Sequence, residues 1–298
     1  TWVATANAVA YCGATPVFVD VDRETFNMDP ASAARGRTPR TRAVIAVHLF
    51  GLCADMDALA EALPGVHLIE DAACAAGAAY RGRSAGSLGK AAAFSFHARK
   101  VITTGEGGMI TTNDPAIAAA ASLRRSHGAR LSPEERHRGL RPYLLPEFDV
   151  VGFNYRMTDL QGALGSVQLS KLDRLVAERR RWAAYYDREL ARIEWLRTPP
   201  TPEGYEHSWQ AYVLMVDESR APLSRNDIME ALLARGIDTR PGTHAVHRLG
   251  CYRGGQGGDP EGFPAAADCE RLSIAIPLHN RMSADDYATV VSALRGLA

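Results

Sequence analysis

A lysine and an aspartate in the first third of the chain could together serve an aldehyde cofactor. Lys100 follows a short apolar strand pattern and precedes the glycine-rich run 103–108, and Asp71 ends an earlier strand pattern. An amine in such a place can form a Schiff base, and the glycines let the backbone turn tightly beside a ligand. A carboxylate can meet the nitrogen of a pyridine ring. Pyridoxal 5′-phosphate (PLP) requires these two roles, so the pair predicts a PLP enzyme.

Both residues also admit ordinary structural roles. Lys100 alone could be a solvated surface lysine, and Asp71 could cap a helix that starts after it. The position of Lys100 favours the chemical interpretation, because desolvation beside a cationic ring would free its amine as nucleophile and base. His48, His97 and His127 share no metal-ligand spacing, so each is interpreted as structural.

The composition excludes several classes of protein. With 298 residues, 46% of them hydrophobic, the chain can bury a large core and form about two domains. A formal net charge of +0 gives no electrostatic reason to expect nucleic acid or an anionic membrane as partner. The five scattered cysteines predict reduced thiols and no metal site. No apolar run could span a bilayer and no signal peptide is recognisable, so the predicted location is cytoplasmic.

The elements of the first half explain how these side chains are positioned. Apolar, non-alternating strand patterns separated by helical segments such as 56–63 indicate a largely parallel sheet that is flanked by helices. The predicted strands cover residues 15–21, 43–50, 67–70, 91–96 and 108–112. Ligands bind at the carboxyl ends of such strands. Asp71, Ser95 and Lys100 all stand at or just beyond these ends.

The second half predicts more helix and a smaller α+β domain. After a helix at 115–125 and an excursion at 129–148, a long helix begins at Thr158, with Gln161 completing a capping box. The charged run 178–181 on this helix is interpreted as a solvated face. The later elements are a strand at 211–216, helices capped by Ser224 and Ser283, and a loop at 253–262. The predicted domains are residues 1–172 and 173–298.

Several ordered blocks of the sequence resemble the fold-type I, PLP-dependent sugar aminotransferases of the DegT type. The blocks are residues 1–7, 13–22, 47–51, 69–73, 94–97 with Lys100, 104–109, 152–157 and 168–172. Any one block would be weak, but their order and spacing run through nearly the whole chain. The resemblance implies a fold-type I PLP-transferase with a smaller C-terminal domain, active as a homodimer with shared active sites.

The resemblance also implies roles for individual residues. Lys100 should bind PLP as a Schiff base and move protons, and Asp71 should pair with the pyridinium nitrogen. Trp2 should stack on the ring, and Ser95 should bind the phosphate. Asn154 should reach the phosphate in the neighbouring subunit's site. His244, His247 and Arg240 are candidates for the rim of a nucleotide groove, although structural roles explain them equally well.

Departures from the family pattern are confined to a few places. Cys74, predicted to contact the cofactor, stands where the family usually has Gln or His, and Ala76 stands where His is common. The family's phosphate-binding Ser/Gly/Thr turn would lie upstream of Thr1, so we expect that an N-terminal segment is missing. Related dehydratases carry His at the position of Lys100, so the lysine favours transamination over dehydration.

The expected reaction is transfer of an amino group from L-glutamate to a keto-sugar that is linked to a nucleotide, with a weak preference for the 4-keto position. The alternatives are a PLP-binding regulatory or inactive homologue and an aminotransferase that acts on a keto-cyclitol. A plain α/β nucleotide-binding module is disfavoured, because no Gly-x-Gly-x-x-Gly fingerprint follows the first predicted strand.

Overall fold

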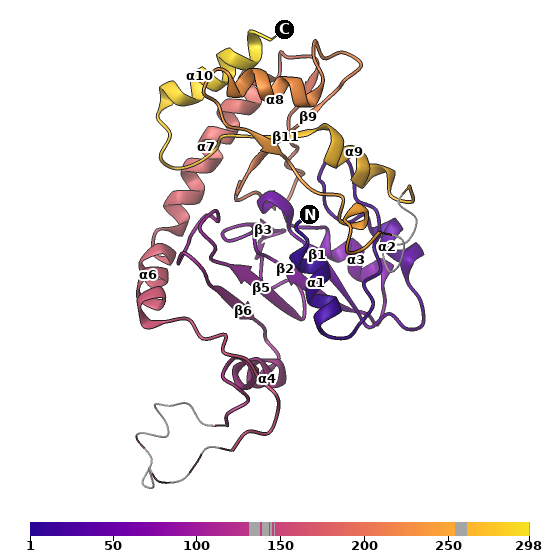
Figure 1. The fold of residues 1–298 in the computed structure, drawn as a ribbon, viewed down its shortest axis with the longest axis vertical. Coiled ribbons are helices and arrows are strands. Elements are labelled where there is room, and N and C mark those ends of the chain that lie inside the picture. Colours follow the sequence, from indigo (N-terminus) through magenta and orange to yellow (C-terminus); the bar gives the residue numbers. More distant parts are fainter. Residues whose placement is uncertain (131–137, 139–142, 144, 146, 254–260, 298) are drawn as a thin grey trace.

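The computed structural model describes residues 1–130, 138, 143, 145, 147–253 and 261–297. The predicted excursion at 129–148 and the predicted loop at 253–262 therefore lie largely outside the described residues. The chain forms two lobes that are connected by a long helix, α7 (Leu172–Leu190) (Figure 1). No helix among the described residues is long and apolar enough to cross a membrane.

The first lobe contains the predicted sheet. Its strands are β1 (Ala43–Val47), β2 (His67–Asp71), β5 (Ala91–Ser95) and β6 (Gly108–Thr111), in the order β1-β2-β5-β6. The first three strands are parallel, and β6 is antiparallel to β5. Since parallel strands end at the same edge of a sheet, the last residues of β2 and β5 lie on the edge where ligands bind.

The strand predicted at residues 15–21 is wrong. Within that stretch only Val21 pairs with another strand-like residue, Met28, in an isolated bridge. Pro16 lacks a backbone N–H, and the N–H of Asp20 donates to the Ser32 hydroxyl instead of to a strand. The apolar pattern therefore marks an extended segment that packs on its surroundings without joining the sheet.

Aspartates fix three of the four helices around the first sheet. The helices are α1 (Ala4–Tyr11), α2 (Pro30–Gly36), α3 (Met56–Ala62) and α4 (Pro115–Arg125). Asp29, Asp55 and Asp114 cap α2, α3 and α4 by accepting backbone N–H bonds at their first turns. Small side chains dominate the core between sheet and helices, and Leu59, Leu63 and Tyr80 are its largest fully buried side chains.

The second lobe is built on an antiparallel sheet. Its strands, in the order β10-β11-β9-β7, are β10 (Arg240–Pro241), β11 (Ser273–Ile276), β9 (Tyr212–Val216) and β7 (Leu196–Arg197). Helices α8 (Arg225–Leu233), α9 (Pro264–Leu272) and α10 (Ala284–Arg295) accompany it, together with α7. Ser224 and Ser283 cap α8 and α10, as predicted. The buried core is rich in tyrosine, with Tyr186, Tyr212 and Tyr287 fully enclosed.

A small third sheet connects the two halves of the sequence. It consists of β4 (Arg83–Ser84), β3 (Ala79–Tyr80) and β8 (Tyr205–Glu206), with β3 in the middle. Strands of two residues carry no readable periodicity, which explains why the sequence did not reveal this sheet. Two short one-turn helices, η1 (Leu49–Gly51) and η2 (Val246–Arg248), complete the described elements.

The long helix predicted from Thr158 is in fact two helices, α6 (Asp159–Leu169) and α7. The capping box of Thr158 and Gln161 at the start of α6 is confirmed. At the break, the Ser170 hydroxyl donates to the Val167 carbonyl, which the Lys171 N–H would use in a continuous α-helix. That N–H donates to Gln168 instead, so the last turn tightens and the helix restarts at Leu172.

The run 178–181 is not simply a solvated face. Arg179 is only 7% exposed, and its guanidinium donates to the carbonyls of Trp209 and Leu278 and to the Asn280 side chain. Burial lowers the pKa of the Arg179 guanidinium. The prediction failed because charge alone does not reveal carbonyls supplied from 30 and 99 positions away in the chain.

Candidate active site

The sheet brings the predicted lysine close to the loop that begins at the predicted aspartate. Asp71 is the last residue of β2, and Cys74 follows it by three positions. Lys100 comes after β5 in a turn closed by its own N–H, which donates to the His97 carbonyl. From there the Lys100 Nζ donates to the Cys74 Sγ over 3.2 Å. The amine therefore lies at the carboxyl edge of the sheet, as the sequence predicts.

The Asp71 carboxylate is held from two sides. Its Oδ1 accepts the N–H of Ala73 over 3.1 Å, and its Oδ2 accepts the hydroxyl of Thr5 over 2.5 Å. Thr5 belongs to α1, at a distance of 66 positions along the chain. Thr5 was not among the predicted site residues, and its only signal in the sequence is its place inside the block at 1–7.

Trp2 precedes α1 and is accessible. It is 64% exposed, and its ring meets His244 edge-on with centroids 5.7 Å apart. The aromatic face is therefore not fully covered by its own chain. His247, a second candidate for the rim, is buried against the ring of Phe263 and does not line an open groove. No hydrogen bond or ring contact in the described residues links Arg240 to these side chains.

Ser95 and the glycine-rich run border the same edge. The Ser95 Oγ accepts the N–H of His97 over 3.3 Å, which leaves its own proton available for an anion. Thr103 folds the run back by donating to the Phe96 carbonyl. At Gly107 φ is +154°, and a Cβ there would lie 2.5 Å from the Thr104 hydroxyl. A side chain at Gly107 would therefore disrupt the turn.

The second lobe holds the backbone on both sides of the Lys100–Cys74 contact. The Ser208 hydroxyl donates to the Cys74 carbonyl over 3.4 Å, and the Gln210 side chain donates to the Arg99 carbonyl over 3.1 Å. Burial raises the pKa of the Cys74 thiol, and the neighbouring Lys100 ammonium offsets that rise only in part. The thiol thus stays protonated at neutral pH and accepts the lysine's hydrogen bond as a neutral group.

This environment predicts slow alkylation of Cys74. Because the thiolate is the nucleophile, we expect iodoacetamide at pH 7.5 (about neutral) to modify the exposed Cys12 and Cys251 on the order of tenfold faster than Cys74. Peptide mapping by mass spectrometry over time measures the three rates in one sample. Equal rates for Cys74 and Cys12 would contradict the protonated thiol.

Asn154 lies apart from this group. It is exposed and pairs with Ser126 in an isolated antiparallel bridge. The rings of its sequence neighbours Phe153 and Tyr155 stack on each other. A single chain therefore does not bring Asn154 to Lys100. Its predicted contact with a cofactor in the neighbouring subunit stays a prediction.

The side chains at the sheet edge suit PLP. Only three of the 34 basic Lys and Arg residues are lysines: Lys90, Lys100 and Lys171. Lys90 faces Asp114 in an ion pair and Lys171 precedes α7, so Lys100 supplies the amine near Asp71. An amine for the aldehyde, a carboxylate for the ring nitrogen and a serine hydroxyl for the phosphate match the chemistry of the group. In the described part of the chain, no three or more His, Cys, Asp or Glu side chains are grouped to hold a metal ion.

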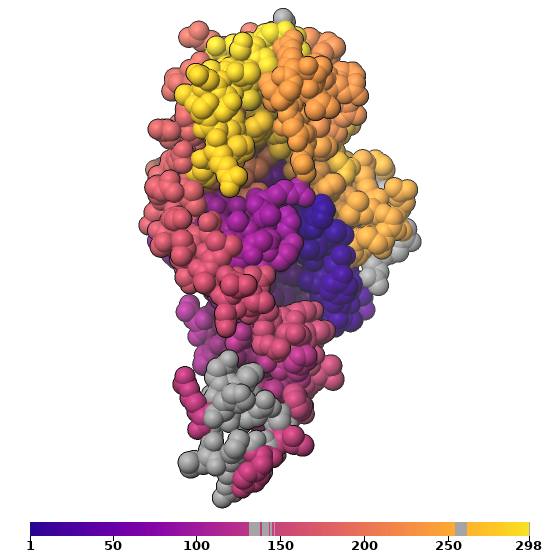
Figure 2. Space-filling view, turned by 60° about the vertical axis from the view of Figure 1, so that its left-hand side comes forward, coloured from indigo at the N-terminus to yellow at the C-terminus, as the bar shows by residue number. Residues whose placement is uncertain are grey.

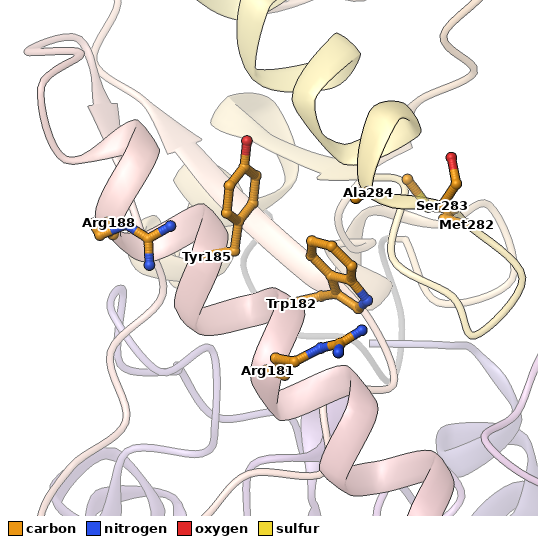
Figure 3. A pocket seen from close by; sticks show the side chains of 7 residues that line it. All are labelled: Arg181, Trp182, Tyr185, Arg188, Met282, Ser283 and Ala284. Atoms are coloured by element: carbon orange, nitrogen blue, oxygen red, sulfur yellow. The ribbon is translucent and has the colours of Figure 1, made fainter.

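A pocket elsewhere on the molecule is separate from this site. It has a volume of about 490 Å³ and lies between α7 and the start of α10, with Trp182 and Tyr185 on one side and Ser283 on the other (Figure 3). Arg181 lies over the Trp182 ring, with 4.7 Å between its guanidinium carbon and the ring centroid. None of the lining residues contacts Asp71, Cys74 or Lys100, so we assign the pocket no part in the chemistry.

Known proteins resemble the chain over almost its whole length. GDP-perosamine synthase of Caulobacter vibrioides is 40% identical over 297 residues, which cover 99% of this chain and 76% of that protein. The solved aminotransferase from Psychrobacter cryohalolentis has a TM-score of 0.91 and 30% identity, covering 99% of this chain and 78% of its own. A putative sugar aminotransferase from Streptococcus pneumoniae, in its PLP form, has a TM-score of 0.90 and 25% identity, covering 100% and 78%.

The family follows directly from these matches. They confirm the predicted mixed α/β fold of a PLP-dependent sugar aminotransferase, with its partly parallel sheet and flanking helices. The model of the DegT/DnrJ/EryC1/StrS aminotransferase family matches residues 1–295. The chain belongs to this family of PLP-dependent sugar aminotransferases.

Proposed function

We propose that this enzyme uses PLP to transfer an amino group from L-glutamate to a keto-sugar that is linked to a nucleotide. The observation that carries the proposal is the 3.2 Å contact of Lys100 Nζ with Cys74, which places the amine beside the loop that starts at Asp71. A nucleophilic amine and a carboxylate for a ring nitrogen are the minimum that the chemistry requires of the protein.

The residues would divide the work as follows. When bound, PLP supplies a conjugated ring that accepts electrons as a proton leaves the carbon beside the substrate nitrogen. Lys100 would hold the aldehyde through Nζ, and its free amine would be the base that moves the proton. Asp71 would accept a hydrogen bond from the ring nitrogen and so keep its proton there. Because the proton moves between nearby carbons, one base can serve both halves of the exchange.

Four further residues are proposed to bind the cofactor. Trp2 would stack on the ring with its exposed face, and Ser95 would donate its free hydroxyl proton to the phosphate. Cys74 would contact the cofactor beside Lys100. Asn154 would reach the phosphate in the partner's site, which is consistent with its exposed position in one chain.

A homodimer with shared sites is supported by exposed apolar side chains. On α6, Leu160 is 85% exposed, and Leu164, Val167 and Leu169 are also exposed. Met109 and Ile110 of β6 are exposed as well. Figure 2 views the molecule from the side on which α6 lies. Apolar surface of this extent favours contact with a second copy.

We further propose that residues 1–172 and 173–298 are the large and small domains, and that the enzyme is cytoplasmic.

The substrate class is inferred from the relatives. The name GDP-perosamine synthase specifies a GDP-linked product, which favours a nucleotide-linked keto-sugar over a keto-cyclitol for this chain. A keto group at the 4-position of the sugar remains a weak preference. An inactive or regulatory homologue would bind PLP and yet fail to convert glutamate, and that difference distinguishes it from the enzyme proposed here.

The glutamate half-reaction tests the proposal. With PLP bound, addition of L-glutamate should shift the visible absorption of the protein and release one equivalent of 2-oxoglutarate per site, to within about 20%, because the amino group stays on the enzyme. Mass spectrometry of a panel of nucleotide-linked 3- and 4-keto-sugars and keto-cyclitols then identifies the acceptor. PLP binding without 2-oxoglutarate release would contradict the aminotransferase and favour the inactive homologue.

A further inference from the structure

One contact at the site has no counterpart among the predicted residues. The Thr5 hydroxyl donates to Oδ2 of Asp71 over 2.5 Å, within the range of hydrogen bonds from a hydroxyl to a charged oxygen. A threonine in the first turns of a helix commonly bonds a nearby carbonyl of the same helix. Thr5 instead reaches across to the end of β2, so its hydroxyl is committed to the carboxylate.

We propose that Thr5 is a positioning residue for transamination, which acts through Asp71. This inference rests on the proposed function. With the Ala73 N–H on Oδ1 and the Thr5 hydroxyl on Oδ2, both carboxylate oxygens are fixed in the plane that they present to the ring nitrogen. Each oxygen keeps a second lone pair for that nitrogen.

The hydroxyl has an electronic effect in addition to the geometric one. A hydrogen bond donated to a carboxylate withdraws charge from it, so the carboxylate becomes a weaker acceptor for other protons. The proton shared between Asp71 and the ring nitrogen is thereby kept on the nitrogen. A protonated ring accepts electrons better, so Thr5 should support the proton-transfer step more than the binding of substrate.

Helix α1 has anchors that do not involve the Thr5 hydroxyl. The Tyr252 hydroxyl donates to the Asn7 side chain over 2.7 Å, and Ala6 is buried in a cluster with Val246 and Tyr252. Because these contacts hold the helix from the second lobe, removal of one hydroxyl should leave α1 in place. The role of Thr5 is therefore separable from the stability of the helix.

The test compares Thr5→Val, which keeps the shape, with Thr5→Ser, which keeps the hydroxyl. In PLP-loaded protein, kcat for the glutamate half-reaction should fall about 10- to 100-fold in Thr5→Val, with KM changed less than about threefold. The ¹⁵N NMR resonance of PLP labelled at the ring nitrogen should move toward that of an unprotonated pyridine. Thr5→Ser should restore both. Thr111→Val is the matched control, because the Thr111 hydroxyl donates to the Gly86 carbonyl and not to Asp71.

The outcomes separate this inference from the proposed function. Wild-type kcat and an unmoved ¹⁵N resonance in Thr5→Val would overturn the role of Thr5 while leaving the aminotransferase intact. Loss of PLP affinity in Thr5→Val that Thr5→Ser does not restore would show a structural role only, which also overturns it. Absence of glutamate turnover in the wild-type protein would refute the proposed function itself, and the inference with it.

Discussion

Replacement of Lys100 by alanine is expected to lower the rate of the glutamate half-reaction on the order of 10⁴-fold or more. The change removes the amine that binds the aldehyde and the base that moves the proton, and each loss is costly by itself. Lys100→Arg should be equally inactive, because a guanidinium keeps the charge but cannot be deprotonated in a protein. Single-turnover absorption after mixing with L-glutamate measures the rate.

The other two lysines provide matched controls. Lys90 is paired with Asp114 at the far end of β5, and Lys171 lies at the break between α6 and α7. Lys90→Ala and Lys171→Ala should keep the wild-type rate within about twofold, since surface substitutions change stability little. Borohydride reduction of the PLP-loaded protein followed by peptide mapping should label Lys100 alone. Label on Lys90 or Lys171, or turnover in Lys100→Ala, would refute the assignment.

Features that depend on neighbouring residues in the sequence could be predicted. Asp71 and Ser95 end apolar strand patterns, and the structure places both at the ends of parallel strands. The capping box of Thr158 and Gln161 is equally local, and it is confirmed. Strand ends and helix caps are determined by a few consecutive side chains, so the sequence alone is sufficient for them.

Features that depend on distant partners could not be predicted. The Thr5–Asp71 bond joins positions 66 apart, and buried Arg179 takes carbonyls from up to 99 positions away. Residues 15–21 have the apolar pattern of a strand and yet find no partner strand beyond one bridge at Val21. A pattern reveals which face a segment buries, whereas the partner is decided only when the whole chain has folded.

Glu70 shows how a buried charge supports the strand that carries Asp71. It is fully buried, and its Oε2 accepts the His48 Nε2–H over 2.9 Å and the Gly86 N–H over 2.6 Å. Its Oε1 accepts the N–H groups of Leu88 and Gly89, each over 2.7 Å. The Ala54 N–H donates to Nδ1 of His48, so the ring proton is on Nε2 and points at Glu70. Four donors thus tie β1, β2 and the loop before β5 to one carboxylate.

Glu70→Gln is therefore expected to lower the free energy of unfolding by about 3–5 kcal/mol, although glutamine has nearly the same shape. In either orientation its NH₂ group would face two donors, at the Leu88 and Gly89 amides or at His48 and the Gly86 amide. Urea unfolding measures the loss, and faster hydrogen exchange at the amides of Gly86, Leu88 and Gly89 should locate it.

The matched control for this substitution is Glu61→Gln, which removes the same charge from an exposed position and should change stability by less than about 0.5 kcal/mol.

The stability difference between wild type and Glu70→Gln should also depend on pH. Burial alone would raise the pKa of Glu70, but the hydrogen bonds from His48, Gly89 and Gly86 lower it below its ordinary value. The carboxylate's contribution is then complete above the ordinary value of 4.5 and is lost as the pH falls below it, so wild type and Glu70→Gln should converge in acid. If the two differed by the same amount at pH values of about 7 and about 3, the charge of Glu70 would not be the cause.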